Sequence, residues 1–535
     1  MAADFFVSPS GNDSNSGTQE APFQTIGFAL TRINLGDVLY LRGGEYRMMK
    51  QGTTTVNFSD SIVDYHIEIR GYPGERAILL GSINTQNKNW YQYTPGIWRI
   101  PADFLTNDPT GMFKFNSGHI SSERISHGPV FFIDGRRSHH HVADMEENTW
   151  TKADINGIAC GTSNADCYLY FKNSIVNPND HIYEFSQRGS FYVTGTDYFV
   201  FENLEVYYTQ SAGIFTEGCD NIIIRNCTFG HNSNGDDNSY SLRIWSSGGA
   251  LIANNKVFDS EYWGGYSNSK GITFMIVDPA NPHIVENNEI YDIAGSAAVG
   301  VKGGVSNLIV RNNYIHDVVL AFHPGDYRCT DSTACDPSDP RFRPGGSWKI
   351  YNNLIINSET GIELPGYEVV GAGGNVIYNN TFYNVETAVG IGWDGAPGNI
   401  FKDNIFANGV AGFYLSSGGT TTTVEDYLDQ FDSYNNIFFN NSFADIHLRP
   451  NWGGTYFSGT PYFLDEFKSI FAGREVDSLS TDPMFGNVGA NNFHPATESL
   501  ACGNASDGGD IGAFDCFGGE EDLIAPSVPS GLSIL

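Results

Sequence analysis

The sequence predicts an all-β solenoid, a parallel β-helix with an N-terminal cap and inserted loops. Between residues 221 and 438 one short phrase recurs: an apolar run, an Asn pair or a close variant, and a hydrophobic pair. The repeats are rich in Val, Ile, Phe and Tyr, which favour strands over helices. Successive repeats are 24 to 40 residues apart. Most steps are too short for a four-stranded propeller blade of about 40–45 residues, and the shorter ones suit one coil of three short strands.

The second residue of each Asn pair marks the same corner of each coil. Side-chain amides stacked at the strand spacing of about 4.8 Å can bond from coil to coil and form a ladder. Asn also favours isolated turns, but eight copies in phase favour the ladder. The eight markers are Cys227, Asn255, Asn288, Asn313, Asn353, Asn380, Asn404 and Asn436.

The N-terminal 48 residues read as the start of this solenoid. A cluster rich in Gly, Asn, Asp and Ser forms a loop, and PFQTIGFAL (22–30) predicts a short helix that caps the open end. VLYLRGGEY (38–46) reads as a first strand and corner, and IEIRGYPGERAILLGS (67–82) continues the coils.

Residues 83–195 interrupt the repeat, so we expect a loop-rich excursion that leans over one face. Its SHHHV run (138–142) is a metal-binding candidate, a sugar-contacting wall or a solvated loop. Regular coils resume at 197–208, and the β-helix domain is expected to span 4–518. The closing stretch 519–535 reads as a linker and the start of a fibronectin type III-like module.

The opening motifs and the DIGAFDC ending resemble secreted right-handed parallel β-helix enzymes that degrade polysaccharides, pectate lyases among them. The resemblance rests on residues 4–48, 67–82 and 507–516. It implies this fold, a polysaccharide substrate and an extracellular location. Calcium-dependent pectate lyases also carry an Asp cluster, of which Asp236 and Asp237 are present while Tyr240 stands at the third position. Calcium is therefore a possible cofactor, although an Asn-Gly-Asp-Asp turn also explains the pair.

Composition excludes some classes of protein. The chain has 61 Asp and Glu against 29 Lys and Arg, a net charge of −32, which argues against a nucleic-acid partner. No apolar run is long enough to span a membrane. We expect a monomer whose partner is a polysaccharide.

The eight cysteines fall into four pairs that are close in the sequence. Short-loop disulfides and an oxidising, secreted location are the expectation, with eight unrelated buried thiols as the alternative. The predicted pairs are Cys160–Cys167, Cys219–Cys227, Cys329–Cys335 and Cys502–Cys516.

Between the Asn corners, each coil carries a second short strand whose alternation assigns a face to every side chain. One predicted outward row is Phe215, Arg243, Thr273, Gly300, Ala321, Glu363, Gly390 and Tyr414. The next is Glu217, Trp245, Met275, Lys302, His323, Pro365 and Gly392, with Tyr240 and Lys270 one step earlier. The alternation therefore predicts that Lys302 and His323 lie side by side on adjacent coils, about 5 Å apart.

This face is the predicted active site. Glycines beside Lys302 let a substrate chain approach, and His323 precedes a long insertion, 324–346, that a disulfide would staple. The candidate catalytic residues are Lys302, His323, Glu363, Arg243 and Asp326. The candidate substrate-binding residues are Lys270, Tyr240, Trp245, Trp393 and Tyr414. Solvated charge and rim packing are the alternative explanations for these side chains.

Two chemistries fit. In a β-elimination lyase a base removes the proton next to a uronate carboxylate, and Lys302 would serve, with Arg243 and His323 on the carboxylate or the leaving oxygen. A hydrolase of a marine sulfated glycan, fucan-like or carrageenan-like, would need a second carboxyl beside Glu363, from Asp326 or Asp394. No strand carries paired carboxylates, which favours the lyase. A noncatalytic glycan-binding solenoid is the third alternative.

Overall fold

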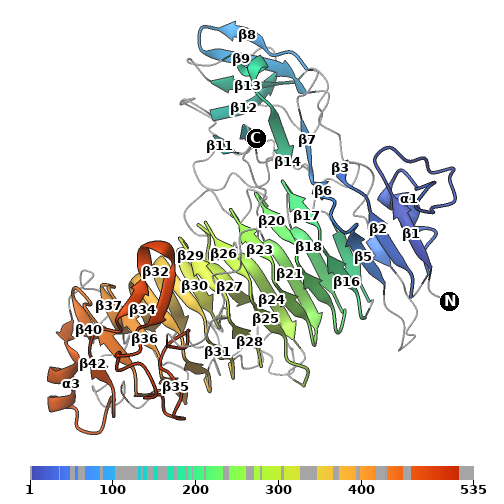
Figure 1. The fold of residues 1–535 in the computed structure, drawn as a ribbon. Helices are drawn as coiled ribbons and strands as arrows, with labels where there is room; N and C mark the ends of the chain where they lie inside the picture. Colours follow the sequence, from blue (N-terminus) through green and yellow to red (C-terminus); the bar gives the residue numbers. More distant parts are fainter. Residues whose placement is uncertain are drawn as a thin grey trace, which may run out of the picture.

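The computed structural model confirms the parallel β-helix: strands of successive coils pair in parallel along the whole stack (Figure 1). It describes residues 3–34, 36–47, 55–57, 67–84, 88–102, 131–133, 136–140, 149–154, 167–172, 177–186, 191–195, 197–209, 212–232, 240–260, 270–277, 280–302, 307–325, 346–364, 373–392, 398–416, 428, 431–449 and 459–516. Predictions for Asp236, Asp237, Asp326 and Trp393 lie outside these residues, as do Cys160, Cys329, Cys335 and the 519–535 module. No helix in the described residues is long and apolar enough to cross a membrane.

One face of the solenoid is a sheet of twelve parallel strands. Its inward side chains, such as Ile252, Val285 and Val310, are fully buried in the main core. In spatial order the strands are β1 (Asp4–Val7), β2 (Val38–Leu41), β5 (Glu68–Gly71), β16 (Val200–Glu202), β19 (Ile223–Arg225), β22 (Leu251–Ala253), β25 (Ile284–Glu286), β28 (Ile309–Arg311), β31 (Lys349–Tyr351), β33 (Val376–Tyr378), β35 (Asn399–Lys402) and β38 (Phe431–Tyr434).

The other two faces form one continuous sheet, because two eleven-residue strands, β32 (Leu354–Leu364) and β34 (Thr381–Ile391), run through both. The face after the Asn corner contains β3 (Gly44–Arg47), β6 (Ala77–Leu80), β17 (Glu205–Tyr207), β20 (Thr228–Gly230), β23 (Lys256–Phe258), β26 (Glu289–Tyr291), β29 (Tyr314–His316), β36 (Ile405–Ala407), β39 (Ile437–Phe439) and β42 (Leu479–Ser480).

The third face bears the predicted site and is called the site face below. It contains β4 (Thr55–Asn57), β15 (Phe191–Thr194), β18 (Ala212–Glu217), β21 (Tyr240–Ser247), β24 (Lys270–Val277), β27 (Ala297–Lys302), β30 (Leu320–His323), β37 (Ala411–Ser416) and β40 (Ala444–Arg449), with β41 (Thr460–Tyr462) antiparallel at its end.

The Asn ladder is present. Each amide nitrogen donates to the amide oxygen of the next coil, at 3.0 Å from Asn255 to Asn288 and 2.9 Å from Asn288 to Asn313. The series continues through Asn353, Asn380 and Asn404 to Asn436. The first residue of each pair has a positive φ, for example 55° at Asn254, a conformation that Asn tolerates better than most residues. One residue therefore turns the chain and the next bonds the coils.

Both ends of the solenoid are covered. The predicted N-terminal helix is α1 (Ile26–Leu30), whose Phe28 backbone N–H donates to the Thr25 hydroxyl. At the other end lies α3 (Leu464–Ile470). The chain then returns along the face after the Asn corner, where the 3-10 turn η4 (Val488–Ala490) and the hairpin of β43 (Phe485–Asn487) with β44 (Asn492–Pro495) pack against β29, β32 and β34. The Cys502–Cys516 disulfide holds the last described segment, as predicted.

The excursion expected to be loop-rich contains eight paired strands that stand off the coils (Figure 1). These strands pair with each other and not with the solenoid, and all pairs are antiparallel except 136–140 with 149–154, which is parallel. In spatial order they are β7 (Ser82–Asn84), β14 (Tyr183–Ser186), β10 (Phe131–Ile133), β11 (Arg136–His140), β12 (Thr149–Asp154), β13 (Cys167–Lys172), β9 (Ile97–Pro101) and β8 (Tyr91–Thr94), with the 3-10 turn η2 (Pro178–Asp180). Arg47 on the solenoid pairs with Glu184 of β14 at 2.9 Å and ties the inserted sheet to the coils.

The predicted Cys219–Cys227 disulfide is wrong, because both residues are buried thiols. Their sulfurs donate instead to backbone carbonyls, Cys219 to Val193 at 3.5 Å and Cys227 to Arg225 at 3.2 Å. Cys227 stands at the head of the Asn ladder, where its backbone N–H donates to Asn255. The two residues are close in the sequence but belong to successive corners of the coil, which is why the predicted pairing was wrong. Cys167 is disulfide-bonded, but its predicted partner lies outside the described residues.

Alkylation checks this correction. Burial raises the pKa of the Cys227 thiol to about 12, and only the thiolate reacts at an appreciable rate. We expect iodoacetamide, without any reductant, to label Cys219 and Cys227 in denaturant and hardly at all in the native protein, as read by peptide mass spectrometry. Absence of label in denaturant would instead support the disulfide.

Candidate active site

The site face carries one continuous outward row across its coils, called the Arg243 row. Cα pairing aligns Phe215 with Arg243, Arg243 with Thr273 and Thr273 with Gly300. After Glu363 it continues through Gly390 and Tyr414 to His447. The prediction of this row is therefore confirmed except at its centre, and His447 extends it. The alternation in ADIHLR (444–449) was the available signal for His447.

At the centre of the row, His323 takes the place predicted for Ala321. His323 is paired with Gly300, and Phe322 pairs with Ile362, which brings His323 next to Glu363. His323 Nε2 lies 4.0 Å from a Glu363 carboxylate oxygen. Ala321 is fully buried within the core. Side chains alternate with a period of two, so a slip of two residues leaves the pattern unchanged, and alternation alone could not detect it.

Lys302 lies in a different row from His323. It is paired with Met275, which follows Trp245 and Glu217 as predicted. Because His323 pairs with Gly300, Lys302 and His323 are two residues out of register on neighbouring strands. The predicted contact between their backbones is therefore wrong.

Arg243 is surrounded by aromatic rings. Its guanidinium carbon lies 4.4 Å from the ring centre of Phe215, 4.7 Å from Trp245 and 5.5 Å from Tyr240. The Phe215 and Trp245 rings stack at 5.9 Å. Such contacts orient a planar cation without neutralising it. Trp245 and the buried Tyr240, both predicted to bind sugar, thus contact Arg243.

Lys270 is fully buried, although it belongs to the outward row that precedes the Arg243 row. The strand bends after it, since a Cβ at Gly271 would lie 2.7 Å from the Ala298 carbonyl oxygen inside the coil. Its side chain passes over the backbone of Gly300, and this surface is called the floor of the site below. A Cβ added at Gly300 would stand 2.7 Å from Lys270 Cε and 2.8 Å from Lys270 Cδ. Glycine at position 300 therefore makes room for the lysine and brings it next to the Arg243 row.

Thr273 contributes a hydroxyl to the same floor. It lies between Arg243 and Gly300 in the row and is fully buried. Its Oγ1 makes no hydrogen bond with any described residue. A buried hydroxyl without a partner is a ready donor or acceptor for a ligand.

The remaining predicted residues are more exposed or lie at the end of the row. The Glu363 side chain is 55% exposed, and Tyr414 meets His447 edge-on, with ring centres 5.1 Å apart. Among the described residues, no group of three or more His, Cys, Asp and Glu is arranged to hold a metal ion. In the described site, three side chains that can carry positive charge surround Gly300: Arg243, Lys270 and His323.

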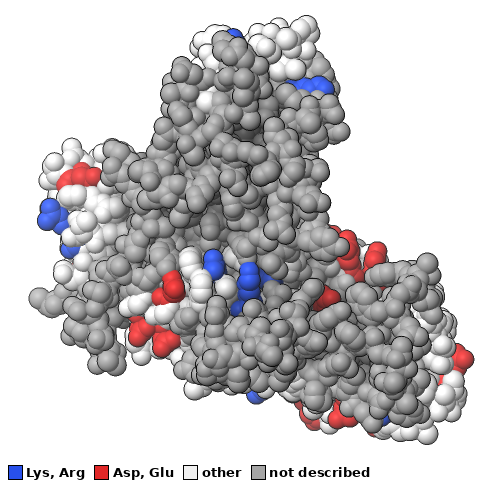
Figure 2. Space-filling model, turned by 180° about the vertical axis from the view of Figure 1, so that it is seen from behind, with Lys and Arg blue, Asp and Glu red and all other residues white. Residues whose placement is uncertain are grey.

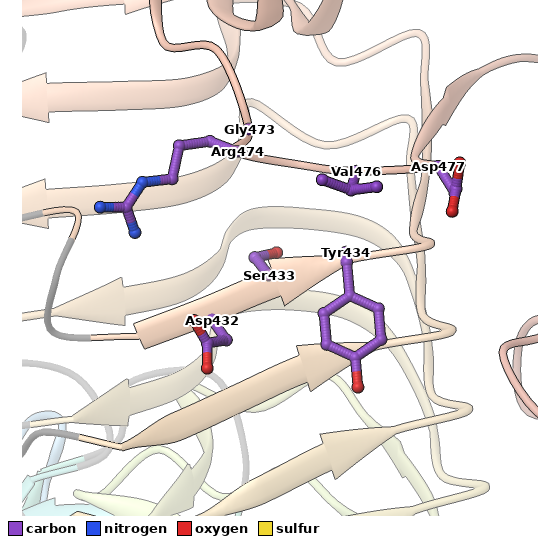
Figure 3. Close-up of a pocket in the computed structure, with 7 residues that line it drawn as sticks. All are labelled: Asp432, Ser433, Tyr434, Gly473, Arg474, Val476 and Asp477. Carbon is purple, nitrogen blue, oxygen red and sulfur yellow. The ribbon is translucent and has the colours of Figure 1, made fainter.

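A pocket of about 240 Å³ lies away from this face, between β38 and the segment 473–477 that precedes β42 (Figure 3). It is lined by Asp432, Ser433, Tyr434, Gly473, Arg474, Val476 and Asp477. Arg474 already donates to the Leu428 carbonyl, and Tyr434 bridges to Val476. No residue of the Arg243 row lines this pocket, so we do not assign the active site to it.

Comparison with known proteins agrees with the fold. A family model described as the right-handed β-helix region matches residues 156–319 and 267–459. A curated pectate lyase, PEL9 of Emericella nidulans, is 29% identical over 139 residues, which is 24% of this chain and 33% of the relative. The chain thus matches only about a third of that relative's length.

Solved structures are similar over most of their length. A structure of XylC in complex with xylose superposes with a TM-score of 0.52 and 13% identity, covering 90% of this chain and 87% of the other. Pectate lyase Pel9A gives a TM-score of 0.47 and 14% identity, covering 96% and 97%. At 13% identity the likeness to XylC concerns the fold alone.

Proposed function

The chain belongs to the right-handed β-helix family, and from the basic site on one face of its coils we propose that it is a polysaccharide-cleaving enzyme. The substrate class that fits best is an acidic polysaccharide, and the reaction that fits best is β-elimination. The observation that carries the proposal is the convergence of Arg243 and the buried Lys270 on the glycine floor at Gly300.

In this reaction a base first removes the proton next to the carboxylate of a uronate ring. Lys270 takes this role, because lysine amines act as bases in sites shielded from water and its side chain lies along the floor. The electron pair left behind forms a carbon–carbon double bond as the glycosidic carbon–oxygen bond breaks. The leaving oxygen takes a proton from His323 or from water.

Arg243 holds the uronate carboxylate in this scheme. A planar guanidinium offers parallel N–H donors that match two carboxylate oxygens. The rings of Phe215 and Trp245 fix its orientation, so little entropy is lost when the substrate binds. Its positive charge also stabilises the negative charge that builds up as the proton leaves.

The lysine is thus reassigned relative to the sequence prediction. Lys302 is the sequence's candidate base, but it lies in the Met275 row, whereas Lys270 crosses the floor beside His323. Lys302 becomes a candidate for binding the substrate at the edge of the site. The partial similarity to a pectate lyase supports a uronate substrate.

Glycosidic hydrolysis is the second candidate, and one observation favours it. Glu363 is a carboxylate in the same row, with His323 4.0 Å away. A hydrolase needs a second carboxyl about 5–9.5 Å from the first, and the two candidates for it, Asp326 and Asp394, lie outside the described residues. The lyase remains the first proposal because the described site brings Arg243 and Lys270 together at Gly300.

Secretion, a monomeric state and a calcium ion at Asp236 and Asp237 complete the proposal. The Cys502–Cys516 disulfide supports secretion. Both aspartates lie outside the described residues, so no step above depends on the ion.

The product distinguishes the candidates. On pectate, alginate or a glycosaminoglycan we expect new chain ends that carry an unsaturated uronate, detected by its ultraviolet absorbance. Reducing ends without that absorbance, lost in Glu363→Gln, would establish hydrolysis instead. Shortening of none of the uronate or sulfated polymers would favour a noncatalytic glycan-binding solenoid.

A further inference from the structure

One face of the inserted sheet is not part of that sheet's hydrophobic core. Its strands β8, β9 and β13 bury Trp90, Ile100, Leu169 and Phe171 in a separate small core on one side. On the other side, cross-strand pairing aligns Tyr91 with Arg99 and Arg99 with Tyr170. The solvent side of an antiparallel sheet is usually polar, so a row of tyrosines there calls for another explanation.

These tyrosines form a platform together with Arg99, called the tyrosine platform. Tyr91 and Tyr93 are 59% and 47% exposed. Tyr93 packs edge-on against Tyr170 at 5.2 Å, and Tyr168 lies 6.3 Å from Tyr170. The platform therefore combines a fixed base of packed rings with two rings open to solvent.

Arg99 is held between two of these rings. Its guanidinium carbon lies 4.9 Å from the centre of Tyr93 and 4.7 Å from Tyr168. Its Nη1 makes no hydrogen bond with any described residue. A guanidinium stacked in this way keeps its charge and orientation, and no described carboxylate forms a salt bridge with it.

The charge of the platform is opposite to that of the whole protein. The chain has a net charge of −32, yet β8, β9 and β13 contain no Asp or Glu, while Arg99 and Lys172 lie on them. On the side that Figure 2 shows, the described atoms at the top of the projecting part are white or blue. Local positive charge on an acidic body attracts anionic ligands.

We propose that the tyrosine platform is a second glycan-binding site, which holds an anionic polysaccharide outside the catalytic face. Exposed tyrosine rings present flat apolar surface to the ring faces of sugars and a hydroxyl at the rim. Arg99 pairs with the acidic groups, whether carboxylate or sulfate. The proposal rests on the proposed function, since the ligand is the polymer that the Arg243 row would cleave.

Affinity electrophoresis of the full chain tests the platform. Gels would contain polygalacturonate, alginate or carrageenan, and a neutral galactan gel would serve as the polymer control. We expect the double variant Tyr91→Ala/Tyr93→Ala, and separately Arg99→Gln, to weaken binding to the retarding acidic polymer about tenfold. Tyr198→Ala, at a tyrosine that is 41% exposed outside the inserted sheet, should bind like the wild type.

The outcomes separate this inference from the proposed function. Weaker binding of the platform variants to the acidic polymer, with unchanged cleavage rates on short oligosaccharides, supports the platform. If the wild type binds the polymer but cleaves nothing, weaker binding of these variants still supports it. Retardation by uronate gels alone or by carrageenan alone identifies the acidic group. Unchanged affinity in the platform variants, or equal retardation by neutral galactan, overturns the proposal whatever the enzyme cleaves.

Discussion

Replacing Lys270 by Met is expected to slow polysaccharide cleavage by about 10²- to 10⁴-fold, the usual contribution of a positioned general base. Methionine keeps an unbranched side chain of similar length in the buried channel over Gly300, so packing changes little. The loss should appear in kcat, because the base acts in the transition state and contributes little to substrate binding. Initial rates of unsaturated-product formation at saturating polymer measure it.

Lys302→Met is the matched control. Lys302 lies on the same face but in the Met275 row, so we expect kcat to change by less than about tenfold. An equal or larger loss in Lys302→Met than in Lys270→Met would contradict the assignment and restore Lys302 as the base. Circular dichroism of both variants verifies that the coils are intact.

Gly300→Ala tests the same arrangement without removing the amine. An added Cβ would stand 2.7 Å from Lys270 Cε, a distance that forces the lysine chain to move. A displacement of about 1 Å can cost about a hundredfold in rate, so kcat should fall while Lys270 remains present. A fully active Gly300→Ala enzyme would show that the position of this side chain does not matter.

The fold was predictable from the sequence because the solenoid repeats its constraints. Each Asn pair places a left-handed residue at a corner and an amide in the ladder, and both requirements recur at every coil. Alternation then assigned most of the outward rows correctly, from Phe215 to Gly300 and from Glu363 to Tyr414.

What the sequence could not supply depends on single contacts. The predicted position of His323 was wrong by two residues along its strand. Side chains alternate with a period of two, so the alternation pattern cannot detect such a shift. The path of Lys270 over Gly300 follows from a bend of the strand at Gly271. The alternation of apolar and polar residues does not predict this bend. The inserted sheet pairs its strands with one another and not with the coils, so the coil repeat carries no information about it.

Replacing Asn353 by Ala is expected to lower the free energy of unfolding by about 3–5 kcal/mol. The Asn353 amide nitrogen donates to the Val310 carbonyl and to the Asn380 amide oxygen, both at 3.0 Å. Its oxygen accepts from the backbone N–H and the side chain of Asn313. Alanine leaves these groups buried without partners, and each unsatisfied group costs about 1–3 kcal/mol. Guanidinium denaturation followed by circular dichroism measures the loss.

Asn384→Gly is the control that distinguishes the contribution of the Asn ladder from that of asparagine as a turn residue. Asn384 has a φ of 53° and its exposed amide donates to Asn357 at 2.8 Å. Glycine adopts this backbone conformation without strain, and water replaces the exposed hydrogen bond, so the loss should stay below about 1 kcal/mol. Similar losses in both variants would mean that asparagine stabilises the coils mainly as a turn residue. A much larger loss at Asn353 would show that the solenoid depends on the continuity of the ladder, because each amide there completes the hydrogen bonds of the coils on both sides.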